Sequence, residues 1–351
     1  MNTRRDTVMM LAAQSFYRLS GFVLVMVLAR ALPPAEIGAF AFAMAFAESF
    51  VAIANFGMSA AMSRRVAADN ATAAERFAEV LGFRAVSGFV YVAVVTTIAA
   101  LFTSASWQIV LAATLIAFVE DTYYAFGSLF LALRKTVYNV TVGLIVQTTF
   151  ITLFLVVMMT RPSLWALIAV NAVRVLSLLS IGTWITQSRL FRLKLAWNNA
   201  AIRIAIPFVG MAVVNALRDQ IGSLMLGVLA NYDQVAYFNL VMRMSIASLS
   251  IPTAICAVLS PLVVAHGLSS ENRKRLLKGA ALILGAALVG SIAVTVLSVP
   301  LARILYGPLA AQTAPLLRVL AWMFPLSFMA LFCSLMLQAL YREMHVLRTM
   351  V

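Results

Sequence analysis

Charged side chains, cysteine and histidine are scarce in this 351-residue sequence. Only 11% of the residues are Asp, Glu, Lys or Arg, whereas a soluble domain carries about a quarter, so an ordinary water-soluble protein is excluded. The two cysteines, Cys256 and Cys333, both lie inside apolar runs, which does not indicate a disulfide framework or a thiolate metal site. The two histidines, His266 and His345, are too few for a histidine-based metal cluster.

The sequence also lacks the motifs of common enzymes. It contains no Gly-rich phosphate loop, no pair of histidines at metal-binding spacing and no nucleophile elbow, and no connection is long enough to hold a nucleotide-binding domain. We therefore predict a protein that is not an enzyme, with no catalytic residue, cofactor or metal. Direct use of ATP by this chain is not expected.

Apolar residues, in contrast, make up 63% of the chain, and the mean hydropathy is +0.99. The apolar runs are long enough to cross a bilayer as helices and do not alternate with polar residues, which excludes an outer-membrane β-barrel. This pattern predicts an all-α polytopic membrane protein with about ten transmembrane helices. The predicted spans cover residues 7–29, 37–62, 80–102, 107–133, 137–159, 163–186, 204–230, 235–262, 279–298 and 313–340.

The net charge of +14 comes from Lys and Arg residues in the connections between apolar runs, not from a separate basic domain. This distribution indicates membrane orientation and no nucleic-acid partner. Seventeen basic residues fall in connections on one predicted side, and only three, Arg30, Arg161 and Arg303, fall on the other. Because basic loops stay in the cytoplasm, both termini are predicted to be cytoplasmic.

The longest predicted cytoplasmic connection, residues 188–203, divides the spans into six and four. It mixes aromatic and basic residues and is expected to lie at the level of the lipid headgroups. We predict an N-terminal six-helix lobe (1–187), this linker (188–203) and a C-terminal lobe with four helices (204–351). A weak repeat supports two parallel lobes, since a shift of 198 residues places Leu28 on Leu226 and Phe40 on Phe238.

Ionisable side chains far from either predicted membrane surface are the candidate functional residues, because such groups are expensive in lipid and usually face a wet cavity. They are Arg18, Glu48, Glu120, Asp121, Arg174, Arg218, Asp219 and Arg243. Asn215 and Asn239 lie one helical turn before Asp219 and Arg243 and share their faces. These residues predict a hydrated chamber between the lobes.

A purely structural alternative remains open for each of these residues. Arg218 with Asp219, or Arg174 with Glu120, can pair with one another and fix helix packing. Arg84 and Arg318 lie nearer the ends of predicted spans and are expected to reach the interface.

Three stretches carry a family pattern. They are ALPPAEIGAFAFAMAFAESFVAIANFGMSAAMSRRVA (31–67), IPFVGMAVVNALRDQIGSLMLGVLANYDQVAYFNLVMRM (206–244), with Asp219 before its LMLG run, and ILYGPLAAQTAPLLRVLA (304–321). These stretches resemble the bacterial polysaccharide transporters, which are lipid-linked oligosaccharide flippases of the multidrug/oligosaccharidyl-lipid/polysaccharide (MOP) exporter superfamily. Members usually have 12 or 14 spans, so the resemblance implies that the second lobe is incomplete relative to the family.

The resemblance implies a multi-pass protein of the bacterial cytoplasmic (inner) membrane that exports undecaprenyl-diphosphate-linked oligosaccharide by alternating access for polysaccharide biosynthesis. Its partners would be this substrate, membrane lipids, and a polysaccharide polymerase with its chain-length machinery. The four mid-span arginines, with Asn215 and Asn239, are the candidate diphosphate contacts. The four acids, Glu48, Glu120, Asp121 and Asp219, are candidates for balancing charge or binding a coupling ion.

Three other interpretations remain. A cation-coupled drug exporter of the same superfamily would depend on one of the acids. A membrane polysaccharide polymerase or ligase would place its functional residues in a large periplasmic loop, and the loops predicted on that side are short. An inactive truncated transporter is the third alternative.

Overall fold

The computed structural model describes residues 3–103, 105–256 and 270–339, and within these ranges every regular element is a helix. In the described residues, seven helices are long and apolar enough to cross a membrane, or nine if each of two bent helix pairs forms one span. The all-α polytopic membrane fold is therefore confirmed, with seven to nine candidate spans where the sequence suggests about ten.

The contacts divide the chain into two compact units. Unit 1 combines residues 1–30 with 237–351, and unit 2 covers residues 31–236. The linker 188–203 thus belongs to unit 2, together with the helix that follows it. This grouping by contact differs from the six-plus-four division, and the two-lobe boundary stays a prediction.

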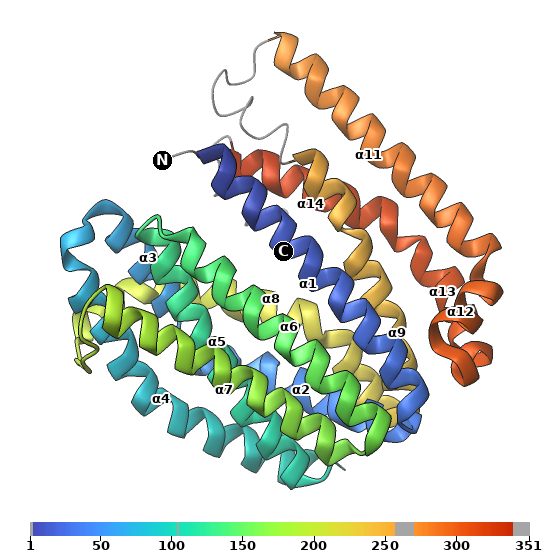
Figure 1. The fold of residues 1–351 in the computed structure, drawn as a ribbon, viewed down its shortest axis with the longest axis horizontal. Helices are drawn as coiled ribbons and strands as arrows, with labels where there is room; N and C mark the ends of the chain where they lie inside the picture. Colours follow the sequence, from blue (N-terminus) through green and yellow to red (C-terminus); the bar gives the residue numbers. More distant parts are fainter. Residues whose placement is uncertain (1–2, 104, 257–269, 340–351) are drawn as a thin grey trace. The chain divides into compact units, whose positions relative to one another are not determined.

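Unit 2 is built around one helix, α5. Its elements are α2 (Pro34–Asn55), α3 (Met58–Ala68), α4 (Ala73–Phe102), α5 (Trp107–Ala132), α6 (Thr136–Thr160), α7 (Leu164–Arg189) and α8 (Asn199–Leu229). α5 packs against α2, α3, α4, α6 and α7, and α6 runs beside α7 (Figure 1). Buried alanines such as Ala113, Ala117 and Ala125 let these neighbours approach α5 closely. Residues on α5 can therefore contact several helices at once.

One predicted span, residues 37–62, is interrupted in the structure. α2 ends at Asn55, and Phe56 and Gly57 both have positive φ values, 47° and 70°, before α3 begins. The Phe56 N–H donates to the Ala52 carbonyl at 2.7 Å, which closes α2 in the left-handed conformation typical of helix C-termini. A glycine at position 57 makes this break inexpensive.

Unit 1 contains α1 (Thr3–Ala31), most of α9 (Tyr232–Ser248), α11 (Ser270–Val296), α12 (Ser298–Tyr306), α13 (Ala310–Ala321) and α14 (Met323–Ala339). Its core includes the fully buried Ile283, Ala287 and Tyr306, and the Tyr306 hydroxyl donates to the Leu240 carbonyl at 3.2 Å. The predicted span 313–340 is not one straight helix, because the chain bends by 47° between Ala321 and Met323.

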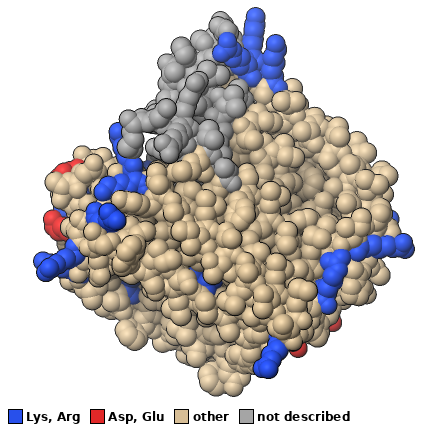
Figure 2. Space-filling view, in the orientation of Figure 1, with Lys and Arg blue, Asp and Glu red and all other residues tan. Residues whose placement is uncertain are grey.

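Large apolar side chains cover much of the surface. Phe89, Leu101 and Met159 are 71–83% exposed, and the face drawn in Figure 2 is mostly uncharged. In water this surface would drive aggregation, whereas in a bilayer it meets acyl chains. The exposed apolar surface thus supports the membrane assignment.

The linker is held against unit 2. The Ala196 N–H donates to the Ala78 carbonyl of α4 at 3.0 Å, and the Trp197 ring stacks on Phe83 with a centroid distance of 6.0 Å. Phe191 and Leu193 pack against the core of unit 2. The linker thus packs on unit 2 through these side chains, while the Trp197 side chain stays half exposed, and its place at the level of the headgroups stays a prediction.

A single buried carboxylate, Glu79, connects the linker to α3 and α4. Its side chain is only 4% exposed and accepts from Arg76 at 2.8 Å, Asn198 at 2.6 Å and Arg65 at 3.3 Å. Charge-assisted hydrogen bonds of this kind are stronger than neutral ones. Glu79 is thus the main polar attachment of the linker.

We expect Glu79→Gln to release the linker while preserving side-chain shape. Loss of a charge-assisted hydrogen bond costs about 1.5–3 kcal/mol, so local opening should become at least about tenfold more frequent. The measurement is the rate at which trypsin cleaves the purified chain after Arg192 and Lys194. Glu75→Gln is the matched control, because Glu75 lies on the same helix but is 64% exposed. Equal cleavage rates for the two variants would contradict this role.

Candidate functional site

Arg84 of α4 forms a buried polar cluster that the sequence did not predict. Its side chain is 2% exposed, and Nη1 donates to Asp121 Oδ2 at 2.6 Å while Nη2 donates to Ser59 Oγ at 3.0 Å. Asn55 Nδ2 donates to the other Asp121 oxygen at 3.2 Å. The cluster joins α2, α3, α4 and α5. The expectation that Arg84 reaches the interface is therefore wrong.

The position of Arg84 well inside its helix follows from where α4 begins. The predicted span starts at residue 80, but α4 starts at Ala73, and the candidate span reaches back to Asn70. The side chain of Asp69 accepts from the Ala71 N–H at 3.0 Å and caps the short 3-10 turn that precedes α4. An Asp before a run of helix formers is a start signal, and it would have placed Arg84 in the middle of the helix.

Glu120 and Arg174 form a bidentate pair between α5 and α7. Arg174 Nη1 lies 3.0 Å from Glu120 Oε1, and Nη2 lies 2.7 Å from Oε2. The guanidinium also lies over the Phe150 ring of α6, 5.4 Å from its centroid. Because Glu120 and Asp121 are consecutive on a helix, they point in different directions, one toward α7 and the other toward α4.

A third contact, from Gln220 Nε2 to Glu48 Oε2 at 2.5 Å, joins α8 to α2. All four predicted acids lie in unit 2. Three of them are on the packed helices α2 and α5, and each of these three accepts a hydrogen bond from a neighbouring helix.

Arg218 and Asp219 of α8 pair with each other at 2.9 Å, yet their side chains remain 51% and 58% exposed. They lie midway along the candidate span segment Phe208–Leu229. Asn215, one turn earlier, is half-buried. This part of α8 is a polar surface in the middle of an apolar helix.

The remaining predicted residues belong to unit 1. Arg18 of α1 donates through Nη1 to Thr253 Oγ1 at 3.1 Å. Asn239 and Arg243 lie one turn apart on α9, and Arg243 is exposed. The structure thus brings together Glu48, Glu120, Asp121, Arg174 and the α8 residues within one unit, and Arg18, Asn239 and Arg243 within the other. The chamber shared by two lobes stays a prediction.

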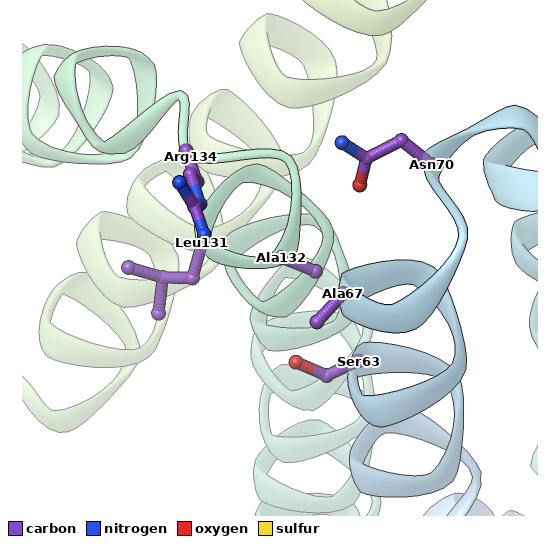
Figure 3. A pocket seen from close by; sticks show the side chains of 6 residues that line it. All are labelled: Ser63, Ala67, Asn70, Leu131, Ala132 and Arg134. Carbon is purple, nitrogen blue, oxygen red and sulfur yellow. The ribbon is translucent and has the colours of Figure 1, made fainter. Parts of the chain in front are cut away.

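A cavity of about 390 Å³ lies at the ends of α3 and α5, outside this polar region (Figure 3). Its lining includes Ser63, Asn70 and Arg134, none of which was a predicted site residue. Over the described residues, no group of three or more His, Cys, Asp or Glu side chains could hold a metal ion.

A family model described as "Polysaccharide biosynthesis protein" matches residues 3–265. The chain belongs to this polysaccharide biosynthesis protein family. No curated protein matches the sequence. The helical bundle, the charged groups at mid-span and the family match agree with the resemblance found in the sequence.

Solved structures place this member of the polysaccharide biosynthesis protein family in the MOP fold. The lipid II flippase MurJ in an inward closed conformation superposes with a TM-score of 0.73 and 13% identity, covering 95% of this chain and 76% of that chain. An inward-facing multidrug resistance MATE transporter of the MOP superfamily gives 0.61 and 15%, covering 98% and 83%. A MOP transporter from Pyrococcus furiosus gives 0.61 and 14%, covering 99% and 83%. The chain therefore shares the fold of these MOP-superfamily transporters, and the family model confirms the predicted polysaccharide family.

Proposed function

We propose that this chain moves a lipid-linked oligosaccharide, carried on undecaprenyl diphosphate, across the bacterial cytoplasmic membrane by alternating access. The exposed pair Arg218–Asp219, midway along an apolar helix, is the observation that carries the proposal. Family membership supports a role in polysaccharide export. The two lobes, cytoplasmic termini and a polymerase partner belong to the same proposal.

Exposed charges in the middle of a membrane-spanning helix need contact with water. A charged side chain at the centre of a bilayer costs about 2.5–3.5 kcal/mol on insertion scales, and the surface around Arg218 and Asp219 is not covered by unit 2. Arg243 is likewise exposed near the middle of the candidate span Tyr232–Cys256. These residues therefore require a hydrated cavity, which is the environment that a sugar diphosphate headgroup needs for its passage.

The arginines supply the chemistry for holding a diphosphate. Guanidinium groups bind phosphate oxygens with two parallel hydrogen bonds, and Arg174 already binds the Glu120 carboxylate in this manner. In our proposal the diphosphate contacts Arg18, Arg174, Arg218 and Arg243, with Asn215 and Asn239 binding polar groups beside them. Glu120 competes with the cargo for Arg174, so release is accompanied by re-formation of the ion pair.

The remaining acids have separate roles in this proposal. Asp121 balances the charge of Arg84, and Asp219 balances that of Arg218. Glu48 is the candidate for binding a coupling ion, and its carboxylate accepts a hydrogen bond from Gln220 of α8.

Reconstitution of the full chain in liposomes with a fluorescent undecaprenyl-diphosphate-linked saccharide tests the proposal. We expect probe in the inner leaflet to become accessible to a membrane-impermeant quencher, and liposomes holding the fourfold variant Arg18→Gln, Arg174→Gln, Arg218→Gln and Arg243→Gln to lose this transfer. The amount of inserted protein is matched between samples. Transfer by the fourfold variant at the wild-type rate would show that the proposed site is wrong. Ion-driven export of a soluble cationic drug without lipid transfer would favour the drug exporter.

A further inference from the structure

A second basic cavity lies in unit 1, where α12 turns into α13. It measures about 430 Å³, a volume within the usual range for small-ligand sites. Its lining includes Arg303 from the last turn of α12, Gly307 and Pro308 from the turn, Ala311 from the start of α13, and Arg318 from its last turn. None of these residues belongs to the mid-span site proposed above.

Neither Arg303 nor Arg318 has an acidic residue near it in the sequence. No Asp or Glu occurs between residues 272 and 342, which includes all of α12, α13 and α14. Arg318 donates through Nε to Ser298 Oγ at 2.7 Å, so the bond occupies one edge of its guanidinium. Arg303 is exposed. The cavity therefore carries positive charge that no acid on α12, α13 or α14 neutralises.

The backbone adds to this positive potential. α13 is a twelve-residue helix whose N-cap residue, Leu309, makes no side-chain capping hydrogen bond. The first turn, with Ala310 and Ala311, opens on the cavity and carries no acidic side chain. The Ala310 N–H already donates to the Gly307 carbonyl of the 3-10 turn Gly307–Leu309, so the start of α13 attracts anions through its dipole. Two guanidinium groups and this helix start thus surround the same space.

A third arginine, Arg30 of α1, positions the end of α12. Its Nη1 donates to the Leu305 carbonyl at 2.9 Å, and its Nη2 donates to the Ile304 carbonyl. These bonds satisfy carbonyls at the C-terminal end of α12 and thereby hold the turn that carries Arg303. Arg30 and Arg303 are two of the three basic residues on the predicted outer side, and the structure places them at one turn.

We propose that this cavity binds a phosphate group. Two sources share that chemistry: the headgroup of an anionic phospholipid, and a soluble diphosphate. This binding proposal is independent of the proposed transport function. The cavity shares no residue with the mid-span site, and binding of the probes is measured without transport.

The test uses the full chain purified in detergent, with two probes. Inorganic pyrophosphate is titrated by calorimetry, and phosphatidylglycerol is titrated by native mass spectrometry. For at least one probe, the double variant Arg303→Gln with Arg318→Gln should raise the dissociation constant about tenfold. Arg161→Gln is the matched control, because Arg161 is also exposed on the predicted outer side but lies at the end of α6. It should leave both affinities unchanged.

A second variant, Ala311→Asp, keeps the test decisive if the double variant fails to fold. It places a carboxylate in the cavity at a helix N-terminus, where an acid stabilises the helix, and should abolish probe binding while the chain stays folded. Loss of pyrophosphate binding in the variants identifies a soluble phosphate site, and loss of phosphatidylglycerol binding identifies a lipid headgroup site. The proposal is overturned if the wild-type chain binds neither probe, if Ala311→Asp binds as the wild type does, or if Arg161→Gln weakens binding equally.

Discussion

Asp121→Asn is expected to lower the free energy of unfolding by about 3–5 kcal/mol, because it leaves the Arg84 charge buried without its counter-charge. Arg84 is 2% exposed, and its shortest contact is the 2.6 Å bond to Asp121. Water cannot replace the lost carboxylate at that depth. The measurement is unfolding of the purified chain by increasing fractions of denaturing detergent.

Asp219→Asn is the matched control for this effect. It makes the same chemical change in an ion pair whose side chains are more than half exposed, where such pairs contribute about 0–1 kcal/mol. The double variant Arg84→Met with Asp121→Leu should recover most of the lost stability, since apolar side chains of similar volume commonly replace a buried ion pair without loss. Equal destabilisation by Asp121→Asn and Asp219→Asn would show that the Arg84 cluster is not buried as described.

Arg174→Gln should reduce transfer of the lipid-linked saccharide about 100-fold in liposomes with matched amounts of protein. Two charge-assisted hydrogen bonds to the diphosphate are lost, and at about 1.5 kcal/mol each they correspond to two factors of ten. Arg189→Gln, on the exposed end of the same helix, is the control and should transfer normally.

Glu120→Gln separates cargo binding from a purely structural role of the same pair. If Glu120 competes with the diphosphate for Arg174, its neutral substitute should tighten cargo binding about tenfold and slow turnover, because release no longer gains an ion pair. A structural pair predicts something different: both substitutions would destabilise the chain and leave cargo affinity unchanged. The combination of unchanged affinity in Glu120→Gln and full transfer in Arg174→Gln would remove Arg174 from the site.

The helical membrane fold could be predicted because it depends on apolar length, a property of local sequence. The break between α2 and α3 could not. The Phe56–Gly57 break lies inside a continuous apolar run, and only the positive φ values of both residues end α2 there. The bend at residues 321–323, in contrast, has a sign in the sequence, because Pro325 lacks the N–H that would bond the carbonyl of residue 321 and its ring crowds that carbonyl. Hydropathy measures transfer into lipid and carries no information on backbone direction.

The candidate site was partly predictable for the same reason. Mid-span charges stand out in an apolar chain, and two of the possible pairs, Arg174–Glu120 and Arg218–Asp219, are present in the structure. The start of the apolar run places Arg84 near the end of a helix, whereas α4 begins earlier, at Ala73, and Arg84 lies well inside it. The Glu79 attachment of the linker joins residues more than a hundred positions apart, which spacing along the sequence does not reveal.

Sequence alone determined that this chain is an all-α membrane protein, which residues carry charge inside its predicted spans, and that it belongs to a polysaccharide biosynthesis protein family, since composition and family pattern are local. Tertiary structure decided which charges are neutralised and which remain exposed. Asp121 forms an ion pair with Arg84, Glu120 forms one with Arg174, and the Arg218 side chain stays exposed. The physical reason is that the cost of a charge depends on the dielectric and the partners around it, and packing brings those partners from distant parts of the chain.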